Sequence, residues 1–550
     1  MKKPTFKLLA FFAIITLLLI ACSDDSSATA GGGTETDNAI AQDTIVIQDT
    51  VIRQDTIIQR DTLIKQDTIV KQDTIIKQDT ILVRDSSDIP VIQKAAISGA
   101  VQKGPFVSGA SVYIYELNRE DLIQTGKSYR GKTGENGEFK LTNISLDSKY
   151  ALLEASGFYI NEVTGKKSES QVTMTAIADV SGKETVNINF LTHLEYDRVM
   201  HLVTEKGITL SEAKKQAEKE IISTFFGNLS SRNFEELNIF GTTDDDAKLL
   251  ALSVLVLANN SDAQFSELLS NISADLETDG SYDNETVKAS MADFAAFFIN
   301  TPKIRNNMKA FNKGSVPDFE KFIYAFWVHN YGLGECSENN EGEIKKNQNE
   351  ISNYRTTNFQ CSEGKWAPYY FNPEYQYGFI TDERDGKTYR TTKIGEQVWM
   401  AENLRFDGNG HHCYNDDEVY CKRYGYYYTY DQIACPKGWH LPDTTEWRIL
   451  FDAVGGADVA SKHLKSTSWS IAKAPGIEDV QDEFGFSVLP AGVWPFGDEG
   501  NAAFYYTSST ISRDGSVIGA WVVNSTSMDE AIKSNTFTTT MLTARCLQDP

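Results

Sequence analysis

Four side chains in the sequence HHCYNDDEVYC could bind a metal ion. Imidazole and carboxylate groups suit zinc or calcium, and the candidates are His411, His412, Asp416 and Asp417. The alternative is a hydrated loop closed by a disulfide between Cys413 and Cys421. The chain contains no CxxC motif and no His-x-x-x-His spacing, which argues against zinc. We therefore favour the disulfide-closed loop, and we expect no metal and no cofactor.

Cys435 is a second residue with possible chemistry, and it begins the sequence CPKGWHLPDTTEW. It could be a nucleophile, a metal ligand or one half of a disulfide. A serine hydrolase is not supported, because the chain lacks a G-x-S-x-G motif and His440 and His463 have no paired context. The choice among the three roles depends on the compartment in which the protein folds.

The N-terminus indicates export. Three lysines precede an uncharged apolar run from Leu8 to Ile20, which is too short for a membrane span and typical of a secretory signal. The run ends in LIAC, which resembles the bacterial lipobox. This resemblance implies that residues 1–21 are a signal peptide and that Cys22 is lipidated; an ordinary cleaved signal is the alternative. A lipid anchor would attach the protein to a membrane, and we expect an outer-membrane lipoprotein exposed at the cell surface.

In an exported protein, the six remaining cysteines are expected to form disulfides. Proximity along the chain suggests two of the pairs, which leaves the third: Cys336–Cys361, Cys413–Cys421 and Cys435–Cys546. In this pairing Cys435 would be one half of a disulfide. Composition excludes another class of partner, because 76 acidic residues against 52 basic ones give a net charge of −24. Such a chain would be repelled by phosphate backbones, so we expect no nucleic acid.

Two segments follow the signal peptide, a polar tether and a repeat region. Residues 22–41 are polar and Gly-rich and predict a flexible tether. Residues 42–89 contain eight six-residue units, QDTIVI QDTVIR QDTIIQ RDTLIK QDTIVK QDTIIK QDTILV RDSSDI. A period of six is a multiple of the two-residue period of a strand, so each position keeps its face, whereas β-branched residues disfavour a helix. We expect an extended stalk; a compact repeat domain is the alternative.

Three further segments are predicted before the last domain. Residues 95–190 alternate in polarity as in a β-sandwich, and Glu135-Asn136-Gly137 predicts a hairpin turn. Residues 191–330 predict helices, one of them opened by a Thr209/Glu212 capping box and ended by Gly227. Asp244–Asp246 favour the start of a helix over a metal site. Residues 333–367 predict a small β element closed by a disulfide.

The segment 95–190 also resembles a known family. Its sequences SGAVQKGPFVSGASVYIYE and GENGEFKL are similar to the carboxypeptidase regulatory-like, prealbumin-type sandwich. That family usually serves as a spacer or an accessory domain. The resemblance implies no catalytic site.

The last segment, 376–550, predicts an α+β domain. Asp385-Gly386 predicts a type I′ turn between two strands, and a third strand is expected through Trp399. Asp443 is expected to cap a helix that ends at Gly455. The sequences GKTYRTTKIGEQVWMAENLRF, YGYYYTY, CPKGWHLPDTTEW and ARCLQD resemble the Fibrobacter succinogenes major paralogous domain. That family implies no established biochemical activity.

A wider resemblance concerns the fold of this segment. HLPDTTEWRIL and YYTSS are similar to motifs of the formylglycine-generating enzyme family, whose fold is C-type-lectin-like. In such domains a cysteine before a helix joins one on the last strand, and Cys435 and Cys546 match those places. The copper-binding cysteine pair of that enzyme is missing, because Cys546 stands alone after Cys435. The Glu-Pro-Asn and Trp-Asn-Asp motifs of calcium-dependent mannose lectins are also absent.

Together these features indicate a multidomain surface lipoprotein: a lipidated N-terminus and repeat stalk, a β-sandwich, a helical domain and a C-terminal lectin-like α+β domain. Its expected function is non-catalytic binding of a polysaccharide or a protein on a surface. Exposed aromatic side chains would supply the contacts, and the candidates are Tyr426, Tyr427, Tyr428, Trp494 and Phe496. The alternatives are a structural envelope protein without a specific ligand, and a metal-assisted enzyme.

Overall fold

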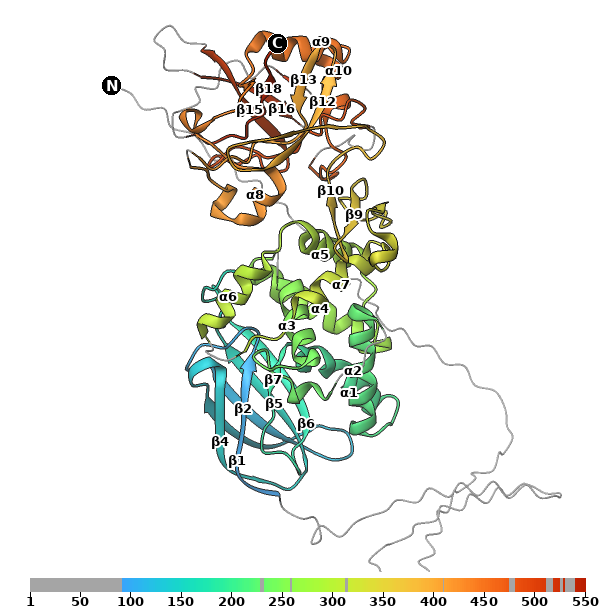
Figure 1. Ribbon diagram of the computed structural model, residues 1–550. Helices are drawn as coiled ribbons and strands as arrows, with labels where there is room; N and C mark the ends of the chain where they lie inside the picture. Colours follow the sequence, from blue (N-terminus) through green and yellow to red (C-terminus); the bar gives the residue numbers. More distant parts are fainter. Residues whose placement is uncertain are drawn as a thin grey trace, which may run out of the picture. The chain divides into compact units, whose positions relative to one another are not determined.

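A computed structural model describes residues 92–550, apart from 228–231, 258–259, 312–314, 409, 474–479, 511–517, 525–527 and 530–539. The expected signal peptide, the lipidated Cys22, the tether (22–41) and the stalk (42–89) all lie outside the described residues. Within the described part of the chain, no helix is both long and apolar enough to cross a membrane. The described residues form a mixed structure of several β-sheets and helices (Figure 1).

The first described elements form two sheets, in which all strand pairs are antiparallel except β1 with β7. One has the order β4-β1-β7, with β1 (Ile92–Gln102), β4 (Glu138–Leu146) and β7 (Ile188–Asn189). The other has the order β3-β2-β5-β6, with β2 (Ser111–Leu117), β3 (Gln124–Lys132), β5 (Tyr150–Gly157) and β6 (Val172–Asp179). Alternate residues of β2 are buried, because successive side chains of a strand point to opposite faces. Val112 and Ile114 of β2 and Leu141 of β4 thus belong to one core, and these two sheets together are called the sandwich.

The turn Glu135-Asn136-Gly137 differs from its prediction. It lies between β3 and β4, but these two strands belong to different sheets, so the turn is a crossover and not a hairpin. Asn136 and Gly137 both have positive φ, as the sequence suggested, and a Cβ on Gly137 would lie 2.4 Å from the carbonyl oxygen of Val101. The sequence predicted the positive φ angles of this turn. It did not predict which strand pairs with β4, because that pairing depends on strands distant in the chain.

Seven α-helices are described after β7 and before the third sheet: α1 (Phe190–Thr204), α2 (Leu210–Phe226), α3 (Asp244–Leu257), α4 (Asp262–Asp279), α5 (Glu285–Phe297), α6 (Thr301–Phe311) and α7 (Glu320–Asn330). The capping box predicted for α2 is present, since Thr209 and Glu212 bond each other reciprocally. Gly227 ends the helix with φ of 73°, a backbone conformation that glycine adopts at little cost.

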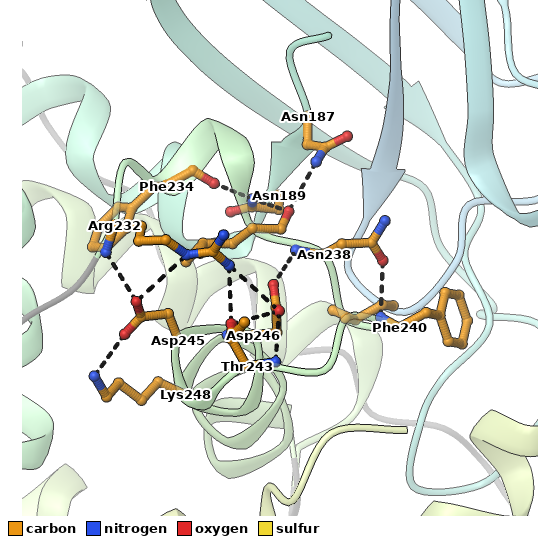
Figure 2. Close-up of polar contacts among 12 residues, drawn as sticks. Asn187, Asn189, Arg232, Phe234, Asn238, Phe240, Thr243, Asp245, Asp246 and Lys248 are labelled. Carbon is orange, nitrogen blue, oxygen red and sulfur yellow. Dashed lines mark hydrogen bonds and ion pairs between the residues drawn. The ribbon is translucent and has the colours of Figure 1, made fainter. Parts of the chain in front are cut away.

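The three aspartates at the start of α3 contact protein groups, and Figure 2 shows the contacts of Asp245 and Asp246. Asp246 and Thr243 form a reciprocal cap, with N–H···O distances of 3.3 and 3.0 Å. Asp245 accepts from Lys248 Nζ at 2.8 Å and from the backbone N–H of Arg232 at 3.1 Å. Asp244 pairs with Lys321 at 2.7 Å. This arrangement is the capping role favoured by the sequence.

The small disulfide-closed element contains β8 (Ile344–Lys346), β9 (Asn358–Ser362) and β10 (Lys365–Tyr369), in the order β10-β9-β8. It shares its core with the sandwich and the helices, because one cluster of buried apolar residues runs from Ile97 to Trp366. Phe359 of β9 is fully buried, and its ring centroid lies 5.4 Å from that of Trp327 and 5.3 Å from that of Tyr331.

The C-terminal part is built around a five-stranded sheet with the order β11-β12-β13-β18-β14. Its strands are β11 (Gly378–Thr381), β12 (Thr388–Ile394), β13 (Gln397–Met400), β14 (Trp439–His440) and β18 (Leu547–Gln548). A second sheet contains β15 (Ala502–Thr510), β16 (Ile518–Asn524) and β17 (Met528–Asp529), and the helices are α8 (Glu418–Tyr424), α9 (Thr444–Ala453) and α10 (Ala457–Leu464). The last strand therefore lies between β13 and β14, far from its neighbours in sequence.

The core of this part joins the first sheet to α9. Trp399 of β13 and Trp447 of α9 are fully buried, with ring centroids 4.8 Å apart. Asp443 caps α9 as predicted, accepting from the backbone N–H of Thr445 and Glu446.

The turn between β11 and β12 is longer than predicted. Six residues, 382–387, connect the strands, so a two-residue type I′ turn at Asp385-Gly386 is wrong. The N–H of Gly386 donates to the carbonyl oxygen of Asp382 at 2.8 Å. The carboxylate of Asp382 is almost fully buried and binds Arg384 at 2.6 Å. Gly386 still supplies the positive φ, 74°, and the ion pair between Asp382 and Arg384 lies within this longer turn.

Candidate functional site

All six cysteines of the described residues are paired as proximity suggested. The disulfides are Cys336–Cys361, Cys413–Cys421 and Cys435–Cys546, with Cα–Cα distances of 5.5, 5.1 and 5.8 Å. The third joins Cys435, which precedes β14, to Cys546, which directly precedes β18, the last strand of the C-terminal domain. Cys435 has no free thiol in this structure and is a link rather than a nucleophile.

The four metal candidates do not converge on one point. The ring of His411 stacks on Tyr426, with centroids 3.7 Å apart, and its Nδ1 faces Asp407. The backbone of His412 pairs with Tyr427. Asp417 caps α8 and accepts from Asn300 Nδ2 at 2.7 Å, while Asp416 is exposed.

Among the described residues, the potential ligand cluster in this loop is His411, Cys413 and Cys421. Both of these cysteines are oxidised in one disulfide, so neither offers a thiolate. The loop is held by that disulfide and by protein hydrogen bonds.

The tyrosine run contributes less surface than predicted. Tyr427 and Tyr428 are fully buried, so the expectation that they contact a ligand is corrected. Tyr427 packs in one apolar cluster and Tyr428 in another, because the segment is covered on both faces. The Tyr428 hydroxyl donates to the carbonyl oxygen of Phe406 at 2.9 Å, and burial raises the pKa of this tyrosine. Tyr426 is half-buried between the His411 ring and the Lys387 ammonium group.

The two other aromatic candidates lie on a short closed loop, residues 493–497. The backbone groups of Val493 and Gly497 exchange two hydrogen bonds of 2.8 Å. Trp494 exchanges two more with Met541, at 3.1 and 2.9 Å. Phe496, at the tip, is 64 % exposed, whereas Trp494 is half-buried with its ring centroid 5.3 Å from that of Tyr414. The loop therefore presents one aromatic ring to solvent on a backbone fixed by four hydrogen bonds.

Polar groups surround the base of this loop. Asp498 is exposed, and Glu499 accepts from the hydroxyl of Tyr424. Lys473 Nζ donates to the backbone oxygen of Glu499 at 3.1 Å. Burial, reinforced by the charge of Glu499, raises the pKa of Tyr420 to about 12. The Tyr420 hydroxyl is therefore a neutral hydrogen-bonding group over the physiological pH range.

A second aromatic surface was missed in the sequence. It consists of rings from the segment YYFNPEYQYGF together with the Arg390 guanidinium. Arg390 lies 4.1 Å from the ring centroid of Phe371 and 6.0 Å from that of Phe379, and Phe379 is 66 % exposed. Six aromatic residues in the eleven residues 369–379 were the available signal. The domain boundary expected at residue 376 divides this segment, so the six aromatic residues were not considered together.

Such surfaces suit non-covalent binding. An exposed ring offers its face for stacking or its whole body to a pocket in a partner, and neighbouring carboxylate, amide and guanidinium groups add direction. Among the described residues, Phe379 and Phe496 are the two large aromatic side chains that are mostly exposed.

The C-terminal part thus belongs to the class of disulfide-closed α+β domains in which the last strand lies inside the sheet begun by the first strands. Comparison with known families agrees with this delimitation. Residues 392–547 match the family model described as the Fibrobacter succinogenes major domain. The match begins within β12 and ends in β18, so it contains Phe496 and leaves out Phe379. No curated protein and no solved structure matches the chain significantly.

Proposed function

We propose that the chain is a cell-surface lipoprotein whose C-terminal domain is a non-catalytic, lectin-like binding module for an insoluble polysaccharide. In this proposal, Cys22 carries the lipid anchor, the repeats of residues 42–89 form an extended stalk, and the sandwich is a spacer of the carboxypeptidase regulatory-like kind. The single observation that carries the binding function is Phe496, mostly exposed on the closed loop 493–497.

The physical argument concerns the cost of ordering. A flexible loop loses backbone conformational entropy when it binds, whereas the backbone of a loop closed by hydrogen bonds has lost much of that entropy already. Burying an exposed phenylalanine ring in a complex costs little hydration free energy, because water solvates the faces of the ring poorly. Stacking an aromatic ring on another planar or apolar face contributes about 0.5–1.5 kcal/mol beyond the area buried.

The test is retention on polymers. The chain without its first 22 residues, with its disulfides oxidised, is incubated with insoluble cellulose and with insoluble xylan, and the bound fraction is measured as a function of concentration. We expect saturable retention on one polymer that is lost on reduction of the disulfides. Phe496→Ala should weaken retention about three- to tenfold.

Two variants sharpen this test. Ile123→Ala is the matched control, because Ile123 is 61 % exposed on the sandwich and far in sequence from the family match; it should leave retention unchanged. Phe379→Ala distinguishes the second aromatic surface from the loop. Equal retention of the Phe496→Ala chain and the natural chain would overturn the assignment of the site. Absence of retention on either polymer would overturn polysaccharide binding.

A further inference from the structure

A lysine and a glutamate form a buried ion pair in the core shared by the sandwich and the helices. Lys103 and Glu162 are both fully buried, and Lys103 Nζ lies 3.0 and 2.9 Å from the two carboxylate oxygens of Glu162. Ser253 is the third member, also fully buried. Its hydroxyl donates to Glu162 Oε1 at 2.6 Å, and its backbone oxygen accepts from Lys103 Nζ at 3.2 Å.

The fold brings these residues together from three elements. Lys103 directly follows β1, Glu162 lies in the segment after β5, and Ser253 is in the middle of α3. Gly104 permits the close approach: its φ is +62°, and an added Cβ would lie 1.9 Å from the carbonyl oxygen of Ile160 and 3.2 Å from the carboxyl carbon of Glu162. No larger residue fits there without moving the backbone.

The surroundings exclude water. Lys103 Nζ lies 4.8 Å from the ring centroid of Phe265, 5.4 Å from that of Tyr159 and 6.0 Å from that of Phe190. Burial lowers the pKa of Lys103, and the attraction of Glu162 opposes this only in part. A buried amine whose pKa is lowered gives up a proton more readily to its neighbour, and the neutral amine carries the lone pair that a nucleophile needs.

We propose that Lys103 and Glu162 condense to form an isopeptide bond between Nζ and the carboxyl carbon Cδ. One ammonium proton passes to a carboxylate oxygen, which gives a neutral amine and a neutral carboxylic acid. The amine attacks Cδ, the C–O bond to the protonated oxygen breaks, and a second proton from nitrogen leaves with that oxygen as water. The reaction converts one ammonium and one carboxylate into one secondary amide and one water, with no change in oxidation state.

Distance and orientation favour this step. Because both carboxylate oxygens lie within hydrogen-bonding distance of Nζ, the carbon between them is held within the roughly 3–3.5 Å that separates reacting atoms in near-attack arrangements. The Ser253 hydroxyl bonds to Oε1 and so stabilises negative charge that develops there during attack. Because Lys103 and Glu162 are fully buried, bulk water has little access to the amide, which disfavours the reverse hydrolysis.

The product would leave no polar atom unpaired. The amide retains one N–H and one C=O. The backbone oxygen of Ser253 already lies within reach of the nitrogen, and the Ser253 hydroxyl already donates to Oε1. Condensation therefore replaces two buried charges, which are costly even when paired, with a neutral group whose hydrogen bonds are in place.

A second buried lysine, Lys214, differs from Lys103 in the direction of its pKa shift. Lys214 is also surrounded by carboxylates, with Glu195 in contact and Glu235 at 3.0 Å. Burial favours loss of its proton, but Glu195, Glu235 and Glu218 together outweigh burial and raise the pKa of Lys214. Its amine stays protonated and has no free lone pair, so Lys214 serves as an internal control that should remain an ion pair.

Tryptic peptide mapping by mass spectrometry tests the proposal on the natural chain, after reduction and alkylation of the cysteines. Trypsin cleaves after free lysine, so a bond at Lys103 blocks cleavage there. We expect a branched peptide joining residues 95–119 to residues 150–166, lighter than the sum of the two by the mass of one water. Fragmentation should place the branch at Lys103 and Glu162.

The variants and the internal control decide the outcome. Lys103→Met should abolish the branched peptide, and Lys214→Met should leave it intact. No branched peptide containing Lys214 is expected. Complete cleavage after Lys103 in the natural chain, with the linear peptides 95–103 and 150–166 recovered unmodified, would overturn the proposal and leave a buried ion pair. The experiment is independent of polysaccharide binding, so the two proposals succeed or fail separately.

Discussion

His440 is held between two carboxylates at the end of the C-terminal sheet. Its Nε2 lies 2.9 Å from Glu446 Oε1, and its Nδ1 lies 2.7 Å from Asp549 Oδ1. Burial alone would lower the pKa of His440, but the hydrogen bonds to Asp549 and Glu446 outweigh it, and the pKa is raised above 6.5. The His440 ring thus links the cap of α9 to the chain end that follows β18.

This geometry predicts how stability depends on pH. A base whose pKa is raised in the folded state stabilises the fold fully below its unfolded pKa and loses that contribution as pH rises through its folded pKa. His440→Gln should therefore destabilise the protein more at about pH 5.5 than at about pH 9, by less than about 1 kcal/mol because the ring is partly exposed. Urea unfolding followed by tryptophan fluorescence measures the difference.

The control for this prediction is His329→Gln, since His329 is exposed on α7. It should show no difference between the two pH values. An equal effect of His440→Gln at both values would show that the two contacts do not depend on the charge of the imidazole.

At the scale of elements, the three disulfides differ in the length of chain that each closes. Cys435–Cys546 spans 111 residues, whereas Cys413–Cys421 spans 8. In the chain-entropy model the longer link restricts the unfolded chain more, by about 4–5 kcal/mol against about 2–3 kcal/mol. The longer link also fixes β18 between β13 and β14, where pairing depends on few residues.

We therefore expect unequal costs of removal. The double variant Cys435→Ser/Cys546→Ser should be destabilised by about 2 kcal/mol more than Cys413→Ser/Cys421→Ser, as measured by urea unfolding of each. Hydrogen exchange should rise around β18 and β14 in the first variant and around α8 in the second. A larger loss from the short link would contradict the entropic argument.

The elements also show which local signals were reliable. Thr209 with Glu212, Asp443 with Glu446, and Gly227 mark helix ends at the expected positions, because a cap is formed by residues three or four positions apart. The two turns predicted as hairpins were less well described. Their glycines were identified, but the pairing at Gly137 and the length of the turn at Gly386 depended on groups elsewhere in the fold.

For the whole molecule, the continuous core from Ile97 to Trp366 has a consequence for cooperativity. The sandwich, the helices and the small disulfide-closed element are consecutive segments of the chain, and the structure packs all three around common apolar residues. Segments that share buried contacts are expected to unfold together. Phe359 tests this point, because it lies in the small element but packs on Trp327 and Tyr331.

Phe359→Ala should cost about 3–5 kcal/mol, as is usual for a buried phenylalanine. Hydrogen exchange measured by mass spectrometry should rise in β1 and α1 as well as in β9. Phe486→Ala is the matched control, because Phe486 is fully buried in a separate cluster of the C-terminal part; it should raise exchange in β13 and α9 and leave β1 unchanged. An effect of Phe359→Ala confined to residues 333–369 would show that the small element unfolds alone.

Features that depend on neighbouring residues could be predicted from the amino-acid sequence. Secondary-structure type, helix caps, glycine turns and the most economical pairing of the cysteines all follow from spacing along the chain, and the motifs that resemble the Fibrobacter family placed the C-terminal domain. Phe496 was one of five aromatic residues expected to be exposed, and among those five it is the one that is mostly exposed.

Solvent exposure and the pairing of distant charges became visible only in the folded structure. Tyr426, Tyr427 and Tyr428 are equivalent in sequence, yet only Tyr426 keeps part of its surface exposed, because layers from distant segments cover both sides of the other two. Lys103 and Glu162 meet across 59 residues of chain, and nothing near either one signals the other. Burial and pairing of this kind depend on the packing of whole elements, which no local pattern encodes.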